Sequence, residues 1–320
     1  MHLKPLSLSI IRYSFSMLPA FLASFLFALN ATCASHSVRL SGPVFANLGR
    51  LVIAVTVLGL FAHTLGGGFT SASTPWFLLS GVIGMGLGDL GVFAALPLLG
   101  SRITVLITQC LAAPLAALGE WAWLGTKLTF AQTAWGVVIL LSVAVAVSPS
   151  RSHPPRVKVR PIGFLFGFIA ACGQGFGALI SRKGVNVADA VGEVAPNATF
   201  GLTAAYQRIF AGFIFVVLWF AVLRLFKKLP TGPAHATPAQ RRHATGWMVA
   251  NGLAGPVLGV GCYQWALATT PSGIVLPIAA TAPLLSMPIA FWLEGDRPSK
   301  RAIGGGIIAV AACIALTLAR

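Results

Sequence analysis

Long apolar runs alternate with short polar or proline-rich stretches along the whole chain. A helix needs roughly 20 mainly apolar residues to cross about 30 Å of hydrocarbon. By this measure the sequence predicts ten membrane-spanning segments. They cover about 14–35, 43–63, 76–98, 102–123, 130–148, 161–182, 203–225, 246–268, 272–293 and 301–319.

Residues typical of turns separate these runs. Gly66, Gly67 and Gly68 follow the second run, residues 148–161 are rich in Pro and Arg, and residues 227–242 contain three prolines. Each span should be α-helical, because lipid offers no partner for unpaired backbone groups and the alternating pattern of a barrel is absent. The predicted fold class is therefore an all-α integral membrane protein.

The sequence repeats itself at an offset of 171 residues. Gly81, Gly84 and Gly88 match Gly252, Gly255 and Gly259, and Ser101 matches Ser272. The pattern predicts two five-helix repeats, residues 14–148 and residues 161–319. Since each unit has an odd number of spans, the second copy must be inverted in the membrane, which is a common transporter architecture. The same argument needs residues 1–35 as a helix instead of a cleaved signal peptide.

Composition excludes several other classes of protein. The chain is 57% hydrophobic and 9% charged, whereas a soluble domain carries about 25% charged residues. The net charge of +16 comes from short basic clusters between apolar runs, so we expect no nucleic-acid partner. The cysteines form no CxxC pair and no phosphate-binding GxxxxGK[ST] motif exists, so we expect no metal and no cofactor.

An ordered series of motifs runs through both halves. Residues 76–148 contain Gly88-Asp89, Phe93, Ala95-Leu96, Gly100-Ser101-Arg102, Pro114, Leu124-Gly125, Leu128-Thr129, Gln132 and Gly136. Residues 252–319 repeat it more loosely through Ala266-Leu267, Ser272, Pro283, Gly295-Asp296-Arg297-Pro298 and Gly304.

This series resembles the EamA-like family of the drug/metabolite transporter superfamily, over nearly the whole chain. The resemblance implies a ten-helix multi-pass carrier in the plasma (cell inner) membrane that exports or exchanges small metabolites without an ATPase domain. One departure is that Thr126 stands where the family usually has a Glu, while the second half has Asp296. Glu120 is the nearest carboxylate in the first half.

Asp89 is the leading candidate for chemistry. A carboxylate half-way through a span costs roughly 2.5–3.5 kcal/mol, so it should face the interior and have a partner. It would bind a substrate ammonium group or a proton, or form a structural ion pair. Arg50 and Arg208 would bind a substrate carboxylate or phosphate through the guanidinium fork. Their shallow positions favour the other interpretation, in which they snorkel to the headgroups.

Several polar residues are candidates for lining a cavity. Span nine contains Pro277, Pro283 and Pro288, which predict a bent or partly broken helix near the midplane with the cavity beside it. Helix-to-helix hydrogen bonding is the alternative role for each polar residue. The candidate residues are Gln109, Tyr263, Gln264 and Trp265, with Asn251 and Gln174 beside them.

The sequence favours a secondary carrier of a small organic metabolite or drug, in which one half-bundle rocks against the other. The alternatives are an intramembrane enzyme and a non-transporting sensor or assembly protein. The partners we expect are the lipid bilayer and a small-molecule substrate, and a homodimer is among the assemblies that the sequence allows. The resemblance implies cytoplasmic termini, whereas the basic loops favour the opposite orientation, so both orientations stay open.

Overall fold

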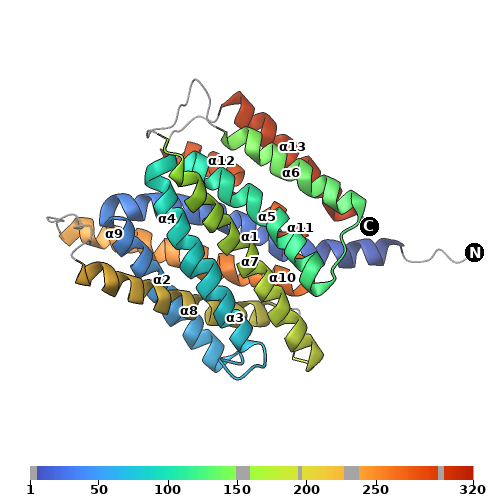
Figure 1. Ribbon diagram of the computed structural model, residues 1–320, viewed down its shortest axis with the longest axis horizontal. Helices are drawn as coiled ribbons and strands as arrows, with labels where there is room; N and C mark the ends of the chain where they lie inside the picture. The colour runs from blue at the N-terminus through green and yellow to red at the C-terminus, as the bar shows by residue number, and fades with distance from the viewer. Residues whose placement is uncertain (1–5, 149–158, 194–196, 227–237, 295–298, 320) are drawn as a thin grey trace, which may run out of the picture.

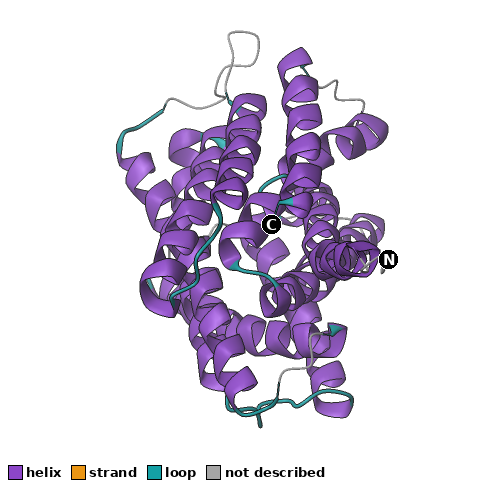
Figure 2. Cartoon of the chain, turned by 90° about the vertical axis from the view of Figure 1, so that its right-hand side faces the viewer, coloured by secondary structure: helices purple, strands orange, loops and turns teal. Residues whose placement is uncertain are grey.

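The computed structural model describes residues 6–148, 159–193, 197–226, 238–294 and 299–319. Throughout these ranges the chain is helix joined by short loops, with no strand (Figure 2). The all-α prediction is therefore confirmed for the described residues. Asp296, Arg297 and the basic residues at 151, 156 and 158 lie outside them.

The described ranges contain thirteen α-helices and two π-helical segments (Figure 1). In chain order they are α1 (Leu6–Ser41), α2 (Pro43–Thr64), α3 (Thr74–Gly81), η1 (Val82–Leu87), α4 (Gly88–Leu99), α5 (Ser101–Leu124), α6 (Phe130–Val147), α7 (Ile162–Ala190), α8 (Ala198–Leu225), α9 (Pro238–Gly252), η2 (Leu253–Gly259), α10 (Val260–Thr269), α11 (Ser272–Ala279), α12 (Ala282–Glu294) and α13 (Lys300–Leu318).

Nine segments of the described chain are long and apolar enough to cross a membrane. The predicted span at about 246–268 is not among them, although α9, η2 and α10 cover it with continuous helix. Asn251, Tyr263 and Gln264 make this segment more polar than the others, and all three are buried within the protein. A segment that faces protein needs less apolar surface than one that faces lipid.

The predicted break in span nine is confirmed. Helix α11 ends at Ala279 and α12 begins at Ala282, so two residues interrupt the helix. Pro283 follows directly, and its ring and missing N–H favour the first turn of a new helix over the middle of an old one. The two π-helical segments were not predicted. Each one lies in a glycine-rich stretch, 81–88 for η1 and 252–259 for η2.

Close backbone contact holds α7 against η1 and α4. A Cβ built on Gly177 would lie 2.9 Å from Cα of Gly84, and one built on Gly173 would lie 2.8 Å from the backbone N of Gly88. Such approaches leave no room for any side chain. They are useful in a bilayer, where helices associate through van der Waals contact more than through the hydrophobic effect.

The remaining helices surround this contact. Helix α8 packs against α2, α3 and α10, and α1 packs against α9, η2, α10 and α12. Helices α6 and α13 lie side by side at one edge of the molecule (Figure 1). Helices α2 to α5 and α10 therefore pack around α7 and α8.

The Gly173→Ala variant should be clearly less stable than the natural protein, because its methyl group would meet backbone atoms that cannot move aside. Overpacking of this kind costs about 1–3 kcal/mol. The measurement is the unfolding temperature of purified protein in detergent. Gly246→Ala is the matched control, since a Cβ built there meets nothing within 4 Å and alanine favours helix. Equal unfolding temperatures for the two variants would contradict the close contact.

Candidate functional site

Three charged residues from different helices meet in the interior. Nη2 of Arg50 on α2 lies 3.7 Å from Oδ2 of Asp89 on α4, and these side chains are 20% and 22% exposed. Asp89 also interacts electrostatically with Arg208 on α8. The prediction that Asp89 has a charged partner is confirmed, and the structure brings all three sequence candidates together.

The two arginines enter from opposite ends of the bundle. Arg50 lies seven residues after Pro43, where α2 begins, and Arg208 lies ten residues after Ala198, where α8 begins. At 1.5 Å per residue these positions are about 10 Å and 15 Å along their helices. Nε of Arg50 donates a hydrogen bond to Oδ1 of Asn47 at 2.8 Å.

Arg208 does not snorkel to the headgroups, so the favoured sequence interpretation is wrong for this residue. Its side chain is only 6% exposed. The guanidinium lies over backbone that carries no side chains: a Cβ on Gly177 would be 3.1 Å from Nη2, and one on Gly84 would collide with the same atom. The glycines therefore give Arg208 room to turn inward, where a side chain at either position would exclude it.

The Arg208 guanidinium has unused hydrogen-bonding capacity. Its Cζ lies 5.8 Å from the centroid of the Tyr263 ring, within the range of a cation–π contact. Within the described part of the chain, Nε and Nη1 are buried and have no hydrogen-bond partner. Leaving buried donors unpaired is costly, so an anionic group at this position would be stabilised.

A chain of buried polar side chains adjoins this site. Nε2 of Gln264 on α10 donates to Oγ of Ser181 at 3.2 Å, and Ser181 lies 2.8 Å from Oγ of Ser80. Ser80 in turn donates to the backbone carbonyl of Gly177. Gly177 is also one of the two glycines beside which the Arg208 guanidinium lies. Gln264 thus links α3, α7 and α10 next to the charges.

The other sequence candidates lie elsewhere. Trp265 packs against Gly201 on α8, seven residues before Arg208. Gln109 is half-buried on α5, and Gln174 is half-buried on α7. Asn251 is buried on α9, and its Oδ1 has no hydrogen-bond partner among the described residues.

Sequence reasoning assigned no role to Glu120, yet it forms a second buried charge cluster. Its side chain is 2% exposed, and Arg182 donates from Nε to Oε1 at 3.1 Å. The backbone N–H of Ser272 donates to Oε2 at 2.7 Å, and the Ser272 hydroxyl bonds the same oxygen. Nη1 of Arg182 also donates to the carbonyl of Leu267 at 2.5 Å. This Glu120 cluster joins α5 to α7, α10 and the first turn of α11.

A polar pocket of about 400 Å³ opens at one end of the bundle. Gln207 lies at its base and donates from Nε2 to the carbonyl of Gly68 at 2.7 Å and to Thr74 at 3.1 Å. Both oxygens of Glu193 accept from the backbone N–H of Ala72. Gln207, which lines the pocket, directly precedes Arg208 on α8. Gln207 was not among the residues selected from the sequence, although a polar residue next to an arginine within an apolar span could have indicated it.

The Glu120→Gln variant should be strongly destabilised, because it leaves the Arg182 guanidinium largely buried without a counter-charge. Breaking one side of a buried pair costs about 3–5 kcal/mol. The double variant Glu120→Gln/Arg182→Gln should recover part of the loss. Glu193→Gln is the control, since an exposed carboxylate contributes little. Unfolding temperatures that rank the double variant below the single one would exclude the ion pair as the cause.

The comparisons with known proteins agree with the motif resemblance. The model of the EamA-like transporter family matches residues 161–318. A solved crystal structure is 18% identical with a TM-score of 0.70, covering 95% of this chain and 97% of that chain, which shows a shared fold. The search of curated proteins gave no match. Residues 161–318 therefore belong to the EamA-like transporter family, and the chain is a multi-pass membrane protein.

Proposed function

We propose that the protein is a secondary carrier in the plasma membrane that exports or exchanges a small organic metabolite by alternating access. The observation that carries the proposal is the Arg208 guanidinium, which is buried near Asp89 and Arg50 and whose Nε and Nη1 have no hydrogen-bond partner among the described residues. A family of transporters together with an unsatisfied charged group in the membrane interior is the pattern expected of a substrate pathway.

We further propose that ten spans form two inverted repeats, with α9, η2 and α10 as the eighth span. The π-helical segments begin at Val82 and Leu253, which are 171 residues apart, and α5 and α11 begin at Ser101 and Ser272 with the same offset. π-Helical segments are rare in proteins. Their recurrence at the same 171-residue offset as the sequence repeat therefore supports a duplication.

The surroundings of the arginines support the same arrangement. The backbone carbonyl of Arg208 packs against Gly81, and that of Arg50 packs against Gly252, again 171 residues further on. Arg50 and Arg208 would thus be equivalent residues that approach the interior from opposite membrane faces. Asp89 has no such equivalent, because Val260 occupies the matching position. The site would therefore contain two arginines related by the repeat, Arg50 and Arg208, and one carboxylate, Asp89.

This arrangement favours a substrate with an anionic group. A carboxylate or phosphate oxygen would accept from Nε and Nη1 of Arg208, and the Tyr263 ring would contact the adjoining part of the molecule. Asp89 would bind an ammonium group of the same substrate or a proton. Gln264 would contribute to the wall through its unpaired Oε1.

Alternating access requires contacts that break and re-form between the proposed halves. The Glu120 cluster is one such contact, since it ties α5 of the first half to α7, α10 and α11 of the second. In this state it would hold one end of the pathway shut. The π-helical segments at η1 and η2 would serve as hinges, because mid-helix irregularities of this kind often lie at functional sites.

Flux measurements in proteoliposomes test the carrier directly. Reconstituted protein should show saturable uptake of at least one member of a panel of amino acids, organic acids, sugar phosphates and organic cations. Competition within the panel should favour compounds with a carboxylate or phosphate. Folded protein with no saturable flux for any member would count against transport.

Arg208→Lys should weaken the apparent substrate affinity by roughly 10- to 100-fold, because lysine keeps the charge but loses the planar fork. The estimate corresponds to one charge-assisted hydrogen bond of about 1.5–3 kcal/mol. Arg224→Lys, at the exposed end of the same helix, is the matched control and should transport normally. A similar KM for Arg208→Lys and Arg224→Lys would contradict a contact between Arg208 and the substrate.

A further inference from the structure

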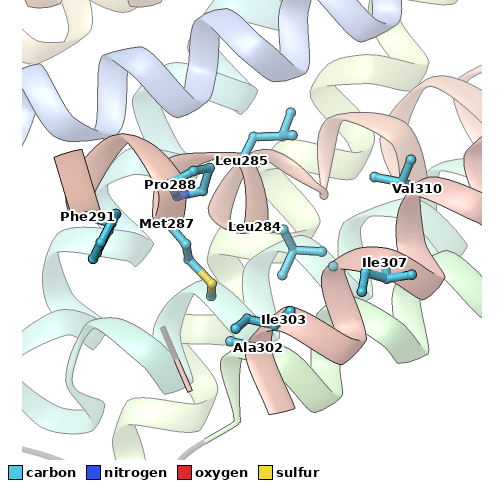
Figure 3. A pocket seen from close by; sticks show the side chains of 10 residues that line it. Leu284, Leu285, Met287, Pro288, Phe291, Ala302, Ile303, Ile307 and Val310 are labelled. Carbon is cyan, nitrogen blue, oxygen red and sulfur yellow. The ribbon is translucent and has the colours of Figure 1, made fainter. Parts of the chain in front are cut away.

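Helices α12 and α13 separate instead of packing along their length. Helix α12 lies mainly against α1, whereas α13 lies mainly against α6. Because their partners stand on different sides, a groove of about 580 Å³ opens between them (Figure 3). We call this the α12–α13 groove. Its volume falls within the range of small-molecule sites in proteins.

Among the described residues, the α12–α13 groove is lined only by apolar ones. Phe291 and Ile307 are 44% and 66% exposed, so the groove is open to the exterior of the bundle. This described lining offers no hydrogen-bonding side chain, which suits hydrocarbon and no polar metabolite. The principal lining residues are Leu284, Met287, Phe291, Ile303, Gly306 and Ile307.

The length and position of the groove match one leaflet of a bilayer. On α13 it runs from Ala302 to Val310, eight residues or about 12 Å of helix, which is close to half of the roughly 30 Å hydrocarbon core. It begins at the end of the bundle where α12 finishes and α13 starts. Trp292, which is 83% exposed, lies at that same end, as expected for a residue at the membrane–water interface.

Two basic residues directly precede Ala302, the first residue of α13 that lines the groove. Lys300 and Arg301 are exposed and form the first turn of α13. Cations are unfavourable at the positive end of a helix, so these charges need an outside anion to be favourable. Arg39 and Arg224 end α1 and α8 at this same end of the bundle, if successive spans alternate in direction. This face therefore suits an anionic membrane surface.

We propose that the α12–α13 groove binds a phospholipid with an anionic headgroup. One acyl chain lies between α12 and α13, and the phosphate contacts Lys300 and Arg301. The inference does not depend on the transported substrate, because its test reads lipid binding alone. A second copy of the chain is the other occupant that an apolar groove in a membrane can take, and it is distinguished by mass.

Gly306 provides a sharp test of the acyl-chain position. A Cβ built there meets nothing within 4 Å and Gly306 lines the groove, so the indole ring of Gly306→Trp should occupy the space proposed for the acyl chain. Gly304 is an equally open glycine of the same helix that does not line the groove, which makes Gly304→Trp the matched control. Unfolding temperatures of both variants should stay close to that of the natural protein.

The experiment is native mass spectrometry of the detergent-solubilised full chain, titrated with phosphatidylglycerol or with phosphatidylcholine. Phosphatidylglycerol should bind as one tight equivalent. Gly306→Trp should lose it, and Gly304→Trp should keep it. Lys300→Gln and Arg301→Gln should each weaken phosphatidylglycerol binding by about fivefold and phosphatidylcholine binding by less, because the choline ammonium offsets the charge of the phosphate.

Three outcomes would overturn the proposal. Equal affinity for phosphatidylglycerol and phosphatidylcholine would show that the site does not select an anionic headgroup. Equal phosphatidylglycerol binding by Gly306→Trp and Gly304→Trp would show that the lipid does not bind in the groove. A dimer that dissociates in Gly306→Trp, with no retained lipid, would assign the groove to a second copy of the chain.

Discussion

The interior of this protein depends on the absence of side chains where α7 meets η1 and α4. A Cβ on Gly177 would meet the backbone of Gly84, and a Cβ on Gly84 would collide with the Arg208 guanidinium, which occupies the space beside both glycines. A side chain on Gly177 would therefore separate α7 from η1, and one on Gly84 would push Arg208 outward. Close packing, which holds helices together in lipid, and the burial of a cation therefore depend on the same few atoms.

The distribution of charge follows from this placement. Among the described interior residues, Glu120 is paired with Arg182 and Asp89 is paired with Arg50, while Arg208 interacts with Asp89 only electrostatically. Arg208 therefore has no ion-pair partner of its own among the described residues, and its Nε and Nη1 have no hydrogen-bond partner there. An anion bound at Arg208 would supply that partner and would change the electrostatic surroundings of the Asp89 carboxylate.

The sequence predicted those features that repeat along a helix. Apolar runs predicted the helices, and three prolines predicted the break between α11 and α12. The span that covers α9, η2 and α10 was predicted in the same way, although Asn251 and Gln264 lower its apolarity.

Features that depend on distant partners were harder to predict. Depth along a helix cannot show that Arg208 turns inward, because that depends on glycines of two other helices. Glu120 was noticed only as a departure from a motif, since its partners Arg182 and Ser272 are 62 and 152 residues away. The π-helical segments have no periodic signature, and the α12–α13 groove exists only because α1 and α6 draw the two helices apart.

The two π-helical junctions differ in a way that bears on motion. At η1, α7 presents Gly173 and Gly177, so two nearly smooth backbones meet. At η2, α1 presents Phe27 against Gly259 and Asn30 against Gly255, and the buried Oδ1 of Asn30 has no hydrogen-bond partner among the described residues. Sliding at η1 moves backbone past backbone, whereas sliding at η2 must displace an aromatic ring and an amide. If the halves are related as proposed, they are equivalent in topology but not in resistance to movement, and η1 is the junction that yields first.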